Sequence, residues 1–240
     1  MGVAGGRMGV PTKSGKRLVI AGAKRLADIA YEFFTTDSEY EVVAFTVDAA
    51  YLDATELYGR PVVPFDQVAH LYPPATHEMF VAIATTGMNR LRERLSQQAK
   101  QLGYRLATFV SSRAHVASTA KVGPNSIIFP MVHVNTMAEI GEGVLLGTGT
   151  IIEHHARIGD YSFLSVNAMV LGEATIGERC FLGAGCIVID DVKVGADCLL
   201  GAGTCIRFDV APGKVFAAPK PVEKPFTSLE YYERLAAGDP

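Results

Sequence analysis

The sequence predicts an α/β unit followed by a parallel β-helix, in a chain of 240 residues. Two observations carry this prediction. Over residues 17–112, short apolar segments that suit strands alternate with amphipathic segments that suit helices. From Val116 onward, aliphatic residues recur at every sixth position, which neither a helical period of about 3.6 nor simple strand alternation explains.

The N-terminal unit is expected to be small and Rossmann-like. Strands separated by helices of this length form right-handed βαβ units and a parallel sheet. No G-x-G-x-x-G motif is present, so the unit is not expected to bind NAD. Strands are predicted at residues 17–22, 40–48, 61–65, 79–86 and 105–112, and helices at 27–34, 65–72 and 89–104.

The second unit is a hexapeptide repeat. All sixteen positions at a spacing of six from Val116 to Ile206 are aliphatic, and a small or β-branched residue stands two positions before each from Val122 onward. Three hexapeptides make one coil of a triangular prism whose aliphatic residues point inward. Glycine suits a corner where a side chain would clash or φ is positive. A second repeat, three hexapeptides long, consists of Val122-Gly123, Ile140-Gly141, Ile158-Gly159, Ile176-Gly177 and Val194-Gly195.

The boundaries follow from these patterns. Residues 113–212 are expected to form the β-helix, and the glycine-rich residues 1–16 a flexible tail. A β-helix cannot cover its own ends. We therefore expect the N-terminal unit to cap one end, and the C-terminal tail, residues 213–240 with its amphipathic segment 228–237, to pack along the other.

Composition excludes several function classes. The formal charge is −3 and no Lys/Arg cluster is present, so we expect no nucleic-acid partner. No apolar run approaches the roughly 20 residues of a membrane helix, and residues 1–16 lack the apolar core of a secretory signal. The chain is therefore expected to be cytoplasmic, without a membrane partner. Reduced structural thiols are expected at Cys180, Cys186, Cys198 and Cys205, which show no CxxC or zinc-ligand spacing.

The pair His154 and His155 is the strongest candidate for chemistry. Residues 18 apart lie on adjacent coils, about 4.8 Å apart. Gly172 then leaves a vacant place and a bare backbone N–H beside His154, and Glu173 is placed to hold or polarise His155. A base beside a free N–H suits acyl transfer, because the base takes a proton and the N–H stabilises an oxyanion. The alternative is that both histidines are merely exposed.

The stretch IIEHHARIGDYSFLSVNAMVLGEATIGERCFLGAG, residues 151–185, resembles the left-handed β-helix sugar acetyltransferases that use acetyl-CoA. The N-terminal unit narrows the resemblance to the bacterial enzymes that acetylate nucleotide-linked amino sugars, the bacillosamine-pathway and sialic-acid O-acetyltransferase-like group. The resemblance implies left-handed coils, acetyl-CoA as acyl donor without a metal, a homotrimer, and a role in surface polysaccharide or glycan biosynthesis.

The resemblance also assigns roles to residues. The catalytic base maps to His154, and the oxyanion and thioester contact maps to the backbone of Gly172. Contacts to CoA map to Phe163, Ala184 and Ala202. In the bacillosamine-pathway members an acidic residue follows the base, whereas His155 stands there in this chain.

By the same resemblance, the loop GAKRLAD binds the nucleotide-sugar. The loop keeps Gly22 but has Lys24 and Arg25, followed by leucine, in place of the family's usual Gly-His. Backbone N–H groups at the start of the following helix favour phosphate, and the two cations add to this attraction. The alternative is that both cations are solvated surface charges.

Three further residues are candidates for the same crevice. Asp48 follows the second strand, where the family places acidic residues against the base or ribose, although an ordinary turn cap is the alternative. Asn89 and Arg92 lie at the start of the helix after the third full strand. Their alternatives are a helix cap and a solvated arginine.

The sequence thus predicts transfer of an acetyl group to an amine, or a hydroxyl, of a nucleotide-linked sugar. One alternative is a non-catalytic hexapeptide-repeat scaffold that binds a nucleotide-sugar or another protein. The other is a zinc carbonic-anhydrase-like lyase, whose metal needs three converging histidines. His115 and His133 are separated by three hexapeptides and stack, but His154 lies on another part of the coil.

Overall fold

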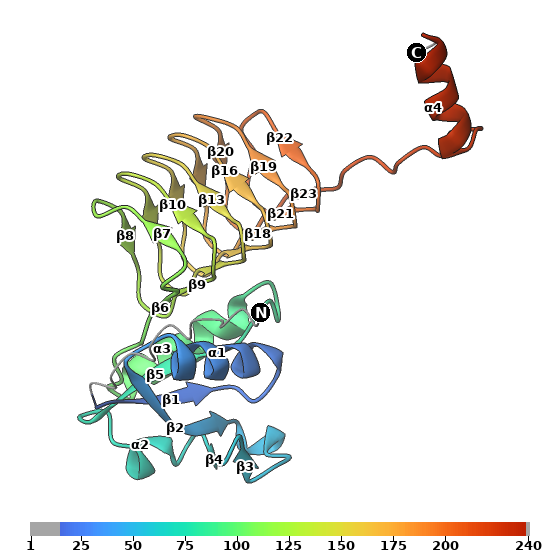
Figure 1. The fold of residues 1–240 in the computed structure, drawn as a ribbon. Coiled ribbons are helices and arrows are strands. Elements are labelled where there is room, and N and C mark those ends of the chain that lie inside the picture. The colour runs from blue at the N-terminus through green and yellow to red at the C-terminus, as the bar shows by residue number, and fades with distance from the viewer. Residues whose placement is uncertain (1–14, 239–240) are drawn as a thin grey trace, which may run out of the picture.

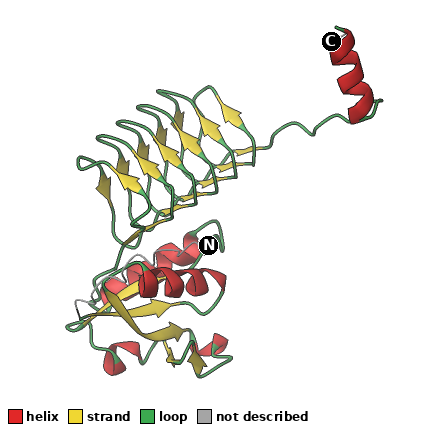
Figure 2. Ribbon diagram, viewed as in Figure 1, coloured by secondary structure: helices red, strands yellow, loops and turns green. Residues whose placement is uncertain are grey.

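The computed structural model describes residues 15–238. Figures 1 and 2 show a small α/β unit at one end, a stack of triangular coils above it, and a C-terminal helix that stands apart. No helix within the described residues is long and apolar enough to cross a membrane.

The N-terminal unit is built on one sheet in the order β3-β4-β2-β1-β5. The pairs β4-β2, β2-β1 and β1-β5 are parallel, whereas β3 and β4 form an antiparallel hairpin that the sequence did not predict. The strands are β1 (Lys16–Ala21), β2 (Tyr40–Val47), β3 (Glu56–Leu57), β4 (Arg60–Pro64) and β5 (His77–Val81). The helices are α1 (Arg25–Thr36), the 3₁₀ turn η1 (Ala49–Tyr51), α2 (Val68–Leu71) and α3 (Arg90–Gln101).

Strand alternation divides the core of this unit between the two faces of the sheet. Leu18 and Ile20 of β1 pack with α1, whereas Val19 and Ala21 pack with residues of α2 and α3. The α1 side also contains Ile127 of the β-helix, so one hydrophobic core joins the two units. The unit packs against successive coils, through Leu145 and Phe163 as well, so it lies along face 1. It does not cap an end of the β-helix, which corrects the expectation from the sequence.

The β-helix has three faces, each a parallel sheet. Face 1, which rests on the N-terminal unit, contains β6 (Phe109–Val110), β9 (Ile127–Ile128), β12 (Leu145–Leu146), β15 (Phe163–Leu164), β18 (Phe181–Leu182), β21 (Leu199–Leu200) and β23 (Val215–Phe216). Face 2 contains β7 (His115–Val116), β10 (His133–Val134), β13 (Ile151–Ile152), β16 (Met169–Val170), β19 (Ile187–Val188) and β22 (Cys205–Ile206). Face 3 contains β8 (Lys121–Val122), β11 (Glu139–Ile140), β14 (Arg157–Ile158), β17 (Thr175–Ile176) and β20 (Lys193–Val194).

The repeat of three hexapeptides sets the register between coils. Ile152, for example, pairs with Val134 on one coil and Val170 on the next. Each aliphatic residue of the hexapeptide repeat is the second residue of a strand between β7 and β22, and from Ile128 onward each is at most 3% exposed. Full burial of such a side chain stabilises by about 1.5–3 kcal/mol. The stacked parallel strands fit the predicted left-handed β-helix.

Close approach of neighbouring coils requires glycine at the corner between face 3 and face 1. A Cβ at Gly123 would lie 2.5 Å from the carbonyl carbon of Gly141, and one at Gly159 would lie 2.5 Å from that of Gly177. Real Cβ atoms do not approach backbone atoms so closely. The prediction that glycine occupies a corner where a side chain would clash is confirmed.

Three predictions about boundaries need correction or stay open. The segment predicted as the closing strand, 105–112, is divided: Leu106 forms an isolated bridge with Met79, and β6 already belongs to face 1. The β-helix therefore begins before residue 113. The helix α4 (Ser228–Ala237) forms with a capping box between Thr227 and Glu230, but it stands away from the coils rather than along them. Of the predicted flexible tail, residues 1–14 lie outside the described residues, and Lys16 already belongs to β1.

Candidate active site

The candidate site lies at the corner between face 2 and face 3. His154, Gly172 and Asp190 occupy the same position of the turn in three successive coils. The residue after each of them has a left-handed backbone, with φ of 59° at His155 and 61° at Glu173. The repeat itself thus aligns a base, a gap and a carboxylate along one edge of the β-helix.

The imidazole of His154 lies against the side-chain-free Gly172, as the coil spacing predicted. A Cβ added to Gly172 would lie 2.6 Å from Cε1 and 2.8 Å from Nε2 of His154. The Gly172 N–H, however, is not free: it donates to Oδ1 of Asp190 at 3.0 Å. The expectation of a bare N–H was therefore wrong, because the Asp190 carboxylate on the next coil accepts this hydrogen bond.

His155 contacts His154 rather than Glu173. The two Nδ1 atoms of the histidines are 3.4 Å apart, and the rings meet edge to face. The Glu173 N–H donates to the His154 carbonyl at 3.0 Å, but its exposed carboxylate has no hydrogen bond or ion pair within residues 15–238. Nearby, Glu153 accepts a hydrogen bond from Asn135 at 2.8 Å. Within residues 15–238, no carboxylate holds the His155 ring.

The predicted CoA contacts lie elsewhere on the same chain. Ala184 and Ala202 are exposed at the corner between face 1 and face 2. Phe163 is a strand residue of face 1, where its ring stacks on Phe181 with centroids 5.2 Å apart. Within one chain the structure does not bring these residues to His154, which lies beyond face 2.

The loop after β1 has the predicted shape. Gly22 has a φ of 129°, and a Cβ there would lie 2.9 Å from the carbonyl oxygen of Ala82. The chain therefore needs glycine to pass β5 at this point. Lys24 and Arg25 are exposed at the start of α1, and the Lys24 ammonium lies 5.9 Å from the centre of the Tyr51 ring.

Asp48 has a local partner. Its carboxylate accepts a hydrogen bond from the Ala50 N–H at 3.0 Å and so caps the short helix η1. The structure therefore shows the turn cap that was the alternative to a substrate contact. The side chain remains exposed at the end of β2.

Asn89 and Arg92 are buried, which contradicts both the expected substrate contact and the alternative of a solvated arginine. Arg92 is 2% exposed and donates to the carbonyl oxygens of Ile83, Ala84, Gly143 and Tyr161. Burial lowers the pKa of Arg92 to about 10. This pKa is still well above neutral pH, so the guanidinium keeps its positive charge. Asn89 is 0% exposed and donates to the Cys180 carbonyl. Both residues connect α3 to the β-helix.

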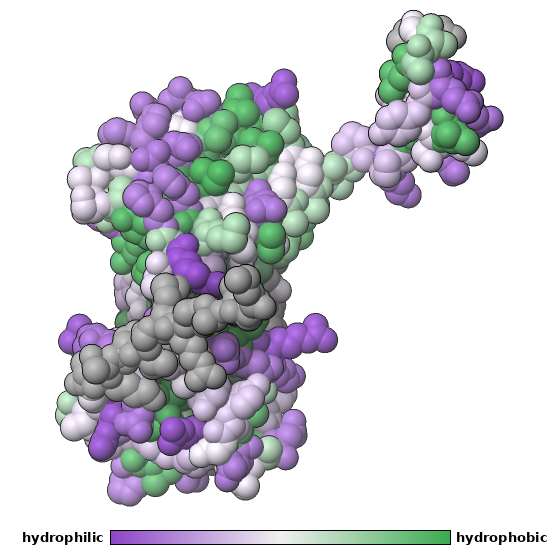
Figure 3. Space-filling model, in the orientation of Figure 1, coloured by the Kyte–Doolittle hydropathy of each residue, from purple (hydrophilic) through white to green (hydrophobic). Residues whose placement is uncertain are grey.

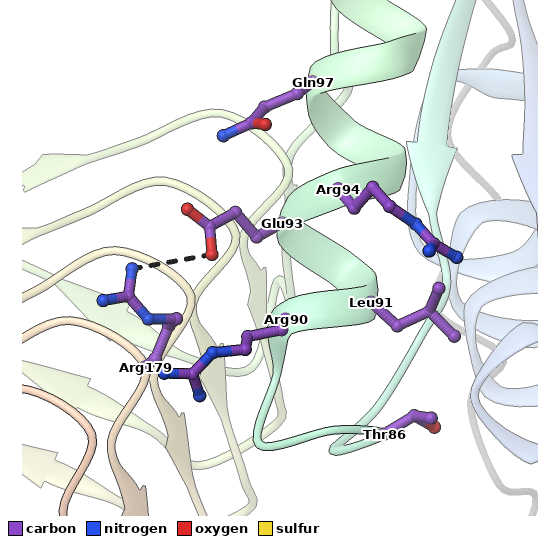
Figure 4. A pocket seen from close by; sticks show the side chains of 7 residues that line it. All are labelled: Thr86, Arg90, Leu91, Glu93, Arg94, Gln97 and Arg179. Carbon is purple, nitrogen blue, oxygen red and sulfur yellow. Dashed lines mark ion pairs between the residues drawn. The ribbon is translucent and has the colours of Figure 1, made fainter. Parts of the chain in front are cut away.

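A hollow that the sequence did not predict lies between α3 and the corner of face 3 and face 1 (Figure 4). Arg179 points from the β-helix toward Glu93 of α3, at 3.5 Å, and also pairs with Asp197 at 3.0 Å. Arg90 of α3 pairs with Asp197 at 2.8 Å. The hydrogen bond from Arg179 holds the pKa of Asp197 below its usual value. These pairs hold the two units together.

The cysteines stand apart from the histidine pair. Cys180, Cys186 and Cys198 are buried and Cys205 is exposed, and all four are free thiols. Burial raises the pKa of Cys180 to about 12, which keeps its thiol protonated and unreactive. His115 and His133 stack as predicted, with ring centroids 4.7 Å apart. Among the described residues, no group of three His, Cys, Asp or Glu is arranged to hold a metal ion.

Comparisons with known proteins agree with this architecture. The family described as GMPPB C-terminal domain matches residues 107–210. A structure of a histidine-to-asparagine mutant of perosamine N-acetyltransferase from Caulobacter crescentus, in complex with CoA and GDP-perosamine, is 28% identical with a TM-score of 0.73, covering 82% of this chain and 91% of that one. No sequence among the curated proteins compared with the chain matches it.

Two less similar structures share the fold. The acetyltransferase domain of PglB from Neisseria gonorrhoeae is 22% identical, with a TM-score of 0.71, and covers 86% of this chain and 100% of that one. WeeI from Acinetobacter baumannii is 21% identical, with a TM-score of 0.69, and covers 83% and 95%. The comparisons confirm the resemblance to sugar N-acetyltransferases and the prediction of an acyltransferase enzyme.

Proposed function

We propose that the chain transfers an acetyl group from acetyl-CoA to an amine of a nucleotide-linked sugar, with His154 as the general base. The observation that carries the proposal is the exposed His154 imidazole beside Gly172, on a β-helix similar to that of perosamine N-acetyltransferase. Such a product suits surface polysaccharide or glycan biosynthesis. A positioned general base contributes about 10²–10⁴-fold in rate.

Acetyl-CoA, His154 and Gly172 each have a separate role in the proposed acetyl transfer. Acetyl-CoA supplies the acetyl group and leaves as the thiol. His154 takes a proton from the acceptor nitrogen, and its Nε2 edge, which faces Gly172, is the side at which the acceptor is placed. The Gly172 N–H can serve an incoming oxygen only when it leaves Asp190, so its predicted oxyanion role requires that exchange. The buried cysteines take no part.

A homotrimer is part of the proposal, because the proposed site uses two corners of the β-helix. His154 and the exposed Ala184 and Ala202 lie on opposite sides of face 2. Figure 3 shows hydrophobic side chains gathered over strands β13, β16 and β19 of this face, whereas face 3 carries a row of charged residues. Apolar contact between copies would bring the corner with His154 against the next copy's alanines. Sedimentation equilibrium tests the trimer.

The nucleotide-sugar is assigned to the N-terminal α/β unit and acyl transfer to the β-helix, which begins at β6. Lys24 and Arg25 flank the first N–H groups of α1, an arrangement that favours a diphosphate. Gly22 keeps the backbone close to β5 beside them. Open sheets with parallel strands bind ligands at the carboxyl ends of the strands, where this loop lies.

The test is thiol release from acetyl-CoA with a panel of UDP-, GDP- and dTDP-linked amino sugars. We expect His154→Ala to lose at least 100-fold in turnover while it still binds acetyl-CoA in calorimetry. His70→Ala is the control, because His70 is an exposed histidine of α2, outside face 2, where the copies are proposed to meet. Unchanged turnover in His154→Ala would remove the base assignment.

A further inference from the structure

Asp190 is an ionisable group beside Gly172 to which the proposed chemistry gives no step of its own. Its side chain is exposed, and Oδ1 is fixed by the Gly172 N–H at 3.0 Å. The other oxygen, Oδ2, has no hydrogen bond within the described part of the chain. A carboxylate anchored through one oxygen is held in orientation and keeps the second oxygen available for a ligand.

The carboxylate and the imidazole face the same point. The position of a Cβ at Gly172 lies 2.8 Å from Nε2 of His154 and 3.2 Å from Oδ1 of Asp190. In residues 15–238 no hydrogen bond or ion pair joins the two side chains to each other. Nε2 and Oδ1 therefore lie within about 6 Å of each other, a span that one ammonium nitrogen can bridge with two hydrogen bonds of about 3 Å from the open side of this corner.

We propose that Asp190 is a specificity-determining residue that binds the acceptor as an ammonium and so selects an amine over a hydroxyl. This inference rests on the proposed acetyl transfer and names its acceptor class. An ammonium carries three N–H donors and a positive charge, which suit a carboxylate on one side and an imidazole on the other. A hydroxyl carries one donor and no charge.

The two protons that the ammonium loses during acetyl transfer can each be followed to an acceptor. Nε2 of His154 takes one proton from the ammonium, which frees the lone pair to form the N–C bond as the C–S bond breaks. The nitrogen loses a second proton on becoming an amide. One of the two protons ends on the departing sulfur, and the other passes to solvent. In this scheme Asp190 stays hydrogen-bonded to the Gly172 N–H, so that N–H is not given to the thioester oxygen, and the carboxylate stabilises the positive charge while it lies on the nitrogen or on His154.

The experiment compares Asp190→Asn with Asp191→Asn. Asparagine keeps an oxygen that can accept from the Gly172 N–H but removes the charge, and Asp191 is an exposed neighbour whose own N–H donates to the Gly172 carbonyl. The acceptors are the amino sugar nucleotide that the wild type uses best in the panel and its counterpart with a hydroxyl in place of the amine. Thermal unfolding verifies that both variants fold.

For Asp190→Asn we expect KM for the amine to rise about tenfold, as loss of one charge-assisted hydrogen bond predicts, with KM for acetyl-CoA within about twofold. Asp191→Asn should match the wild type. An unchanged KM for the amine in Asp190→Asn, or equal use of the hydroxyl counterpart by the wild type, overturns the inference while leaving acetyl transfer intact. A wild type that acetylates neither acceptor overturns the proposed function and this inference with it.

Discussion

Replacing Gly172 by alanine should inactivate the enzyme without unfolding it. The new Cβ would lie 2.6 Å from Cε1 and 2.8 Å from Nε2 of His154, whereas carbon atoms in contact prefer about 3.5–4.0 Å. The ring must therefore move by about 1 Å, and a displacement of that size costs about 10²-fold in rate. Gly172 has no positive φ, so its backbone accepts alanine without strain.

The assay measures thiol release at saturating acetyl-CoA together with the thermal unfolding midpoint. We expect activity about 100-fold lower and a midpoint equal to or slightly above that of the wild type, because alanine reduces the entropy of the unfolded chain. Ser118→Ala is the control, since Ser118 occupies the same turn position two coils before His154. Full activity in a folded Gly172→Ala would refute the geometry on which the site rests.

Three further outcomes follow from the structure. Arg92→Leu should lower the free energy of unfolding by about 3 kcal/mol or more in a denaturant titration, because buried carbonyl groups lose their donor, whereas Arg90→Leu should cost at most about 1 kcal/mol. The lowered pKa of Asp197 stabilises the fold above the pKa of the unfolded chain, and this stabilisation is lost as pH falls through the folded pKa. Asp197→Asn should therefore flatten the decline in stability between about pH 5 and pH 2, measured by unfolding at several pH values; a slope equal to that of the wild type contradicts the pairing with Arg179. Alkylation followed by mass spectrometry should modify Cys205 alone in the native protein and all four cysteines after denaturation; a second native adduct would contradict the burial of the other three.

The β-helix could be predicted because its repeat encodes contacts as well as elements. Backbone hydrogen bonds between coils fix the register at one full coil of three hexapeptides, so the sequence alone placed Gly172 beside His154. The same arithmetic carried one coil further reaches Asp190. The hydrogen bond between Asp190 and Gly172 could nevertheless not be predicted from the repeat. The repeat determines the position of the backbone, but not the side-chain conformation of an exposed residue.

The contacts between the N-terminal unit and the β-helix could not be predicted from the local sequence. The pattern of α3 is that of a charged surface helix, and Arg92 falls within it like a solvated residue. Its acceptors Gly143 and Tyr161 are 51 and 69 residues away, on coils whose position against α3 depends on the whole fold. The hairpin of β3 and β4 was missed for a similar reason, because β3 consists of only two residues, Glu56–Leu57.

Glycine at position 172 has a different cause from glycine elsewhere in the repeat. Every sixth residue from Asn125 to Gly203 has a positive φ, which glycine, asparagine and aspartate tolerate best, but Gly172 lies outside this series. Gly123 and Gly159 are required by backbone atoms of the next coil, whereas the nearest atoms to a Cβ at Gly172 belong to the side chains of His154 and Asp190. Neither the backbone conformation nor the packing of coils therefore demands glycine at this position. The imidazole of His154 and the carboxylate of Asp190 require glycine there, because they occupy the space that a side chain would fill. The absence of a side chain at position 172 therefore indicates a role in the chemistry rather than in the fold.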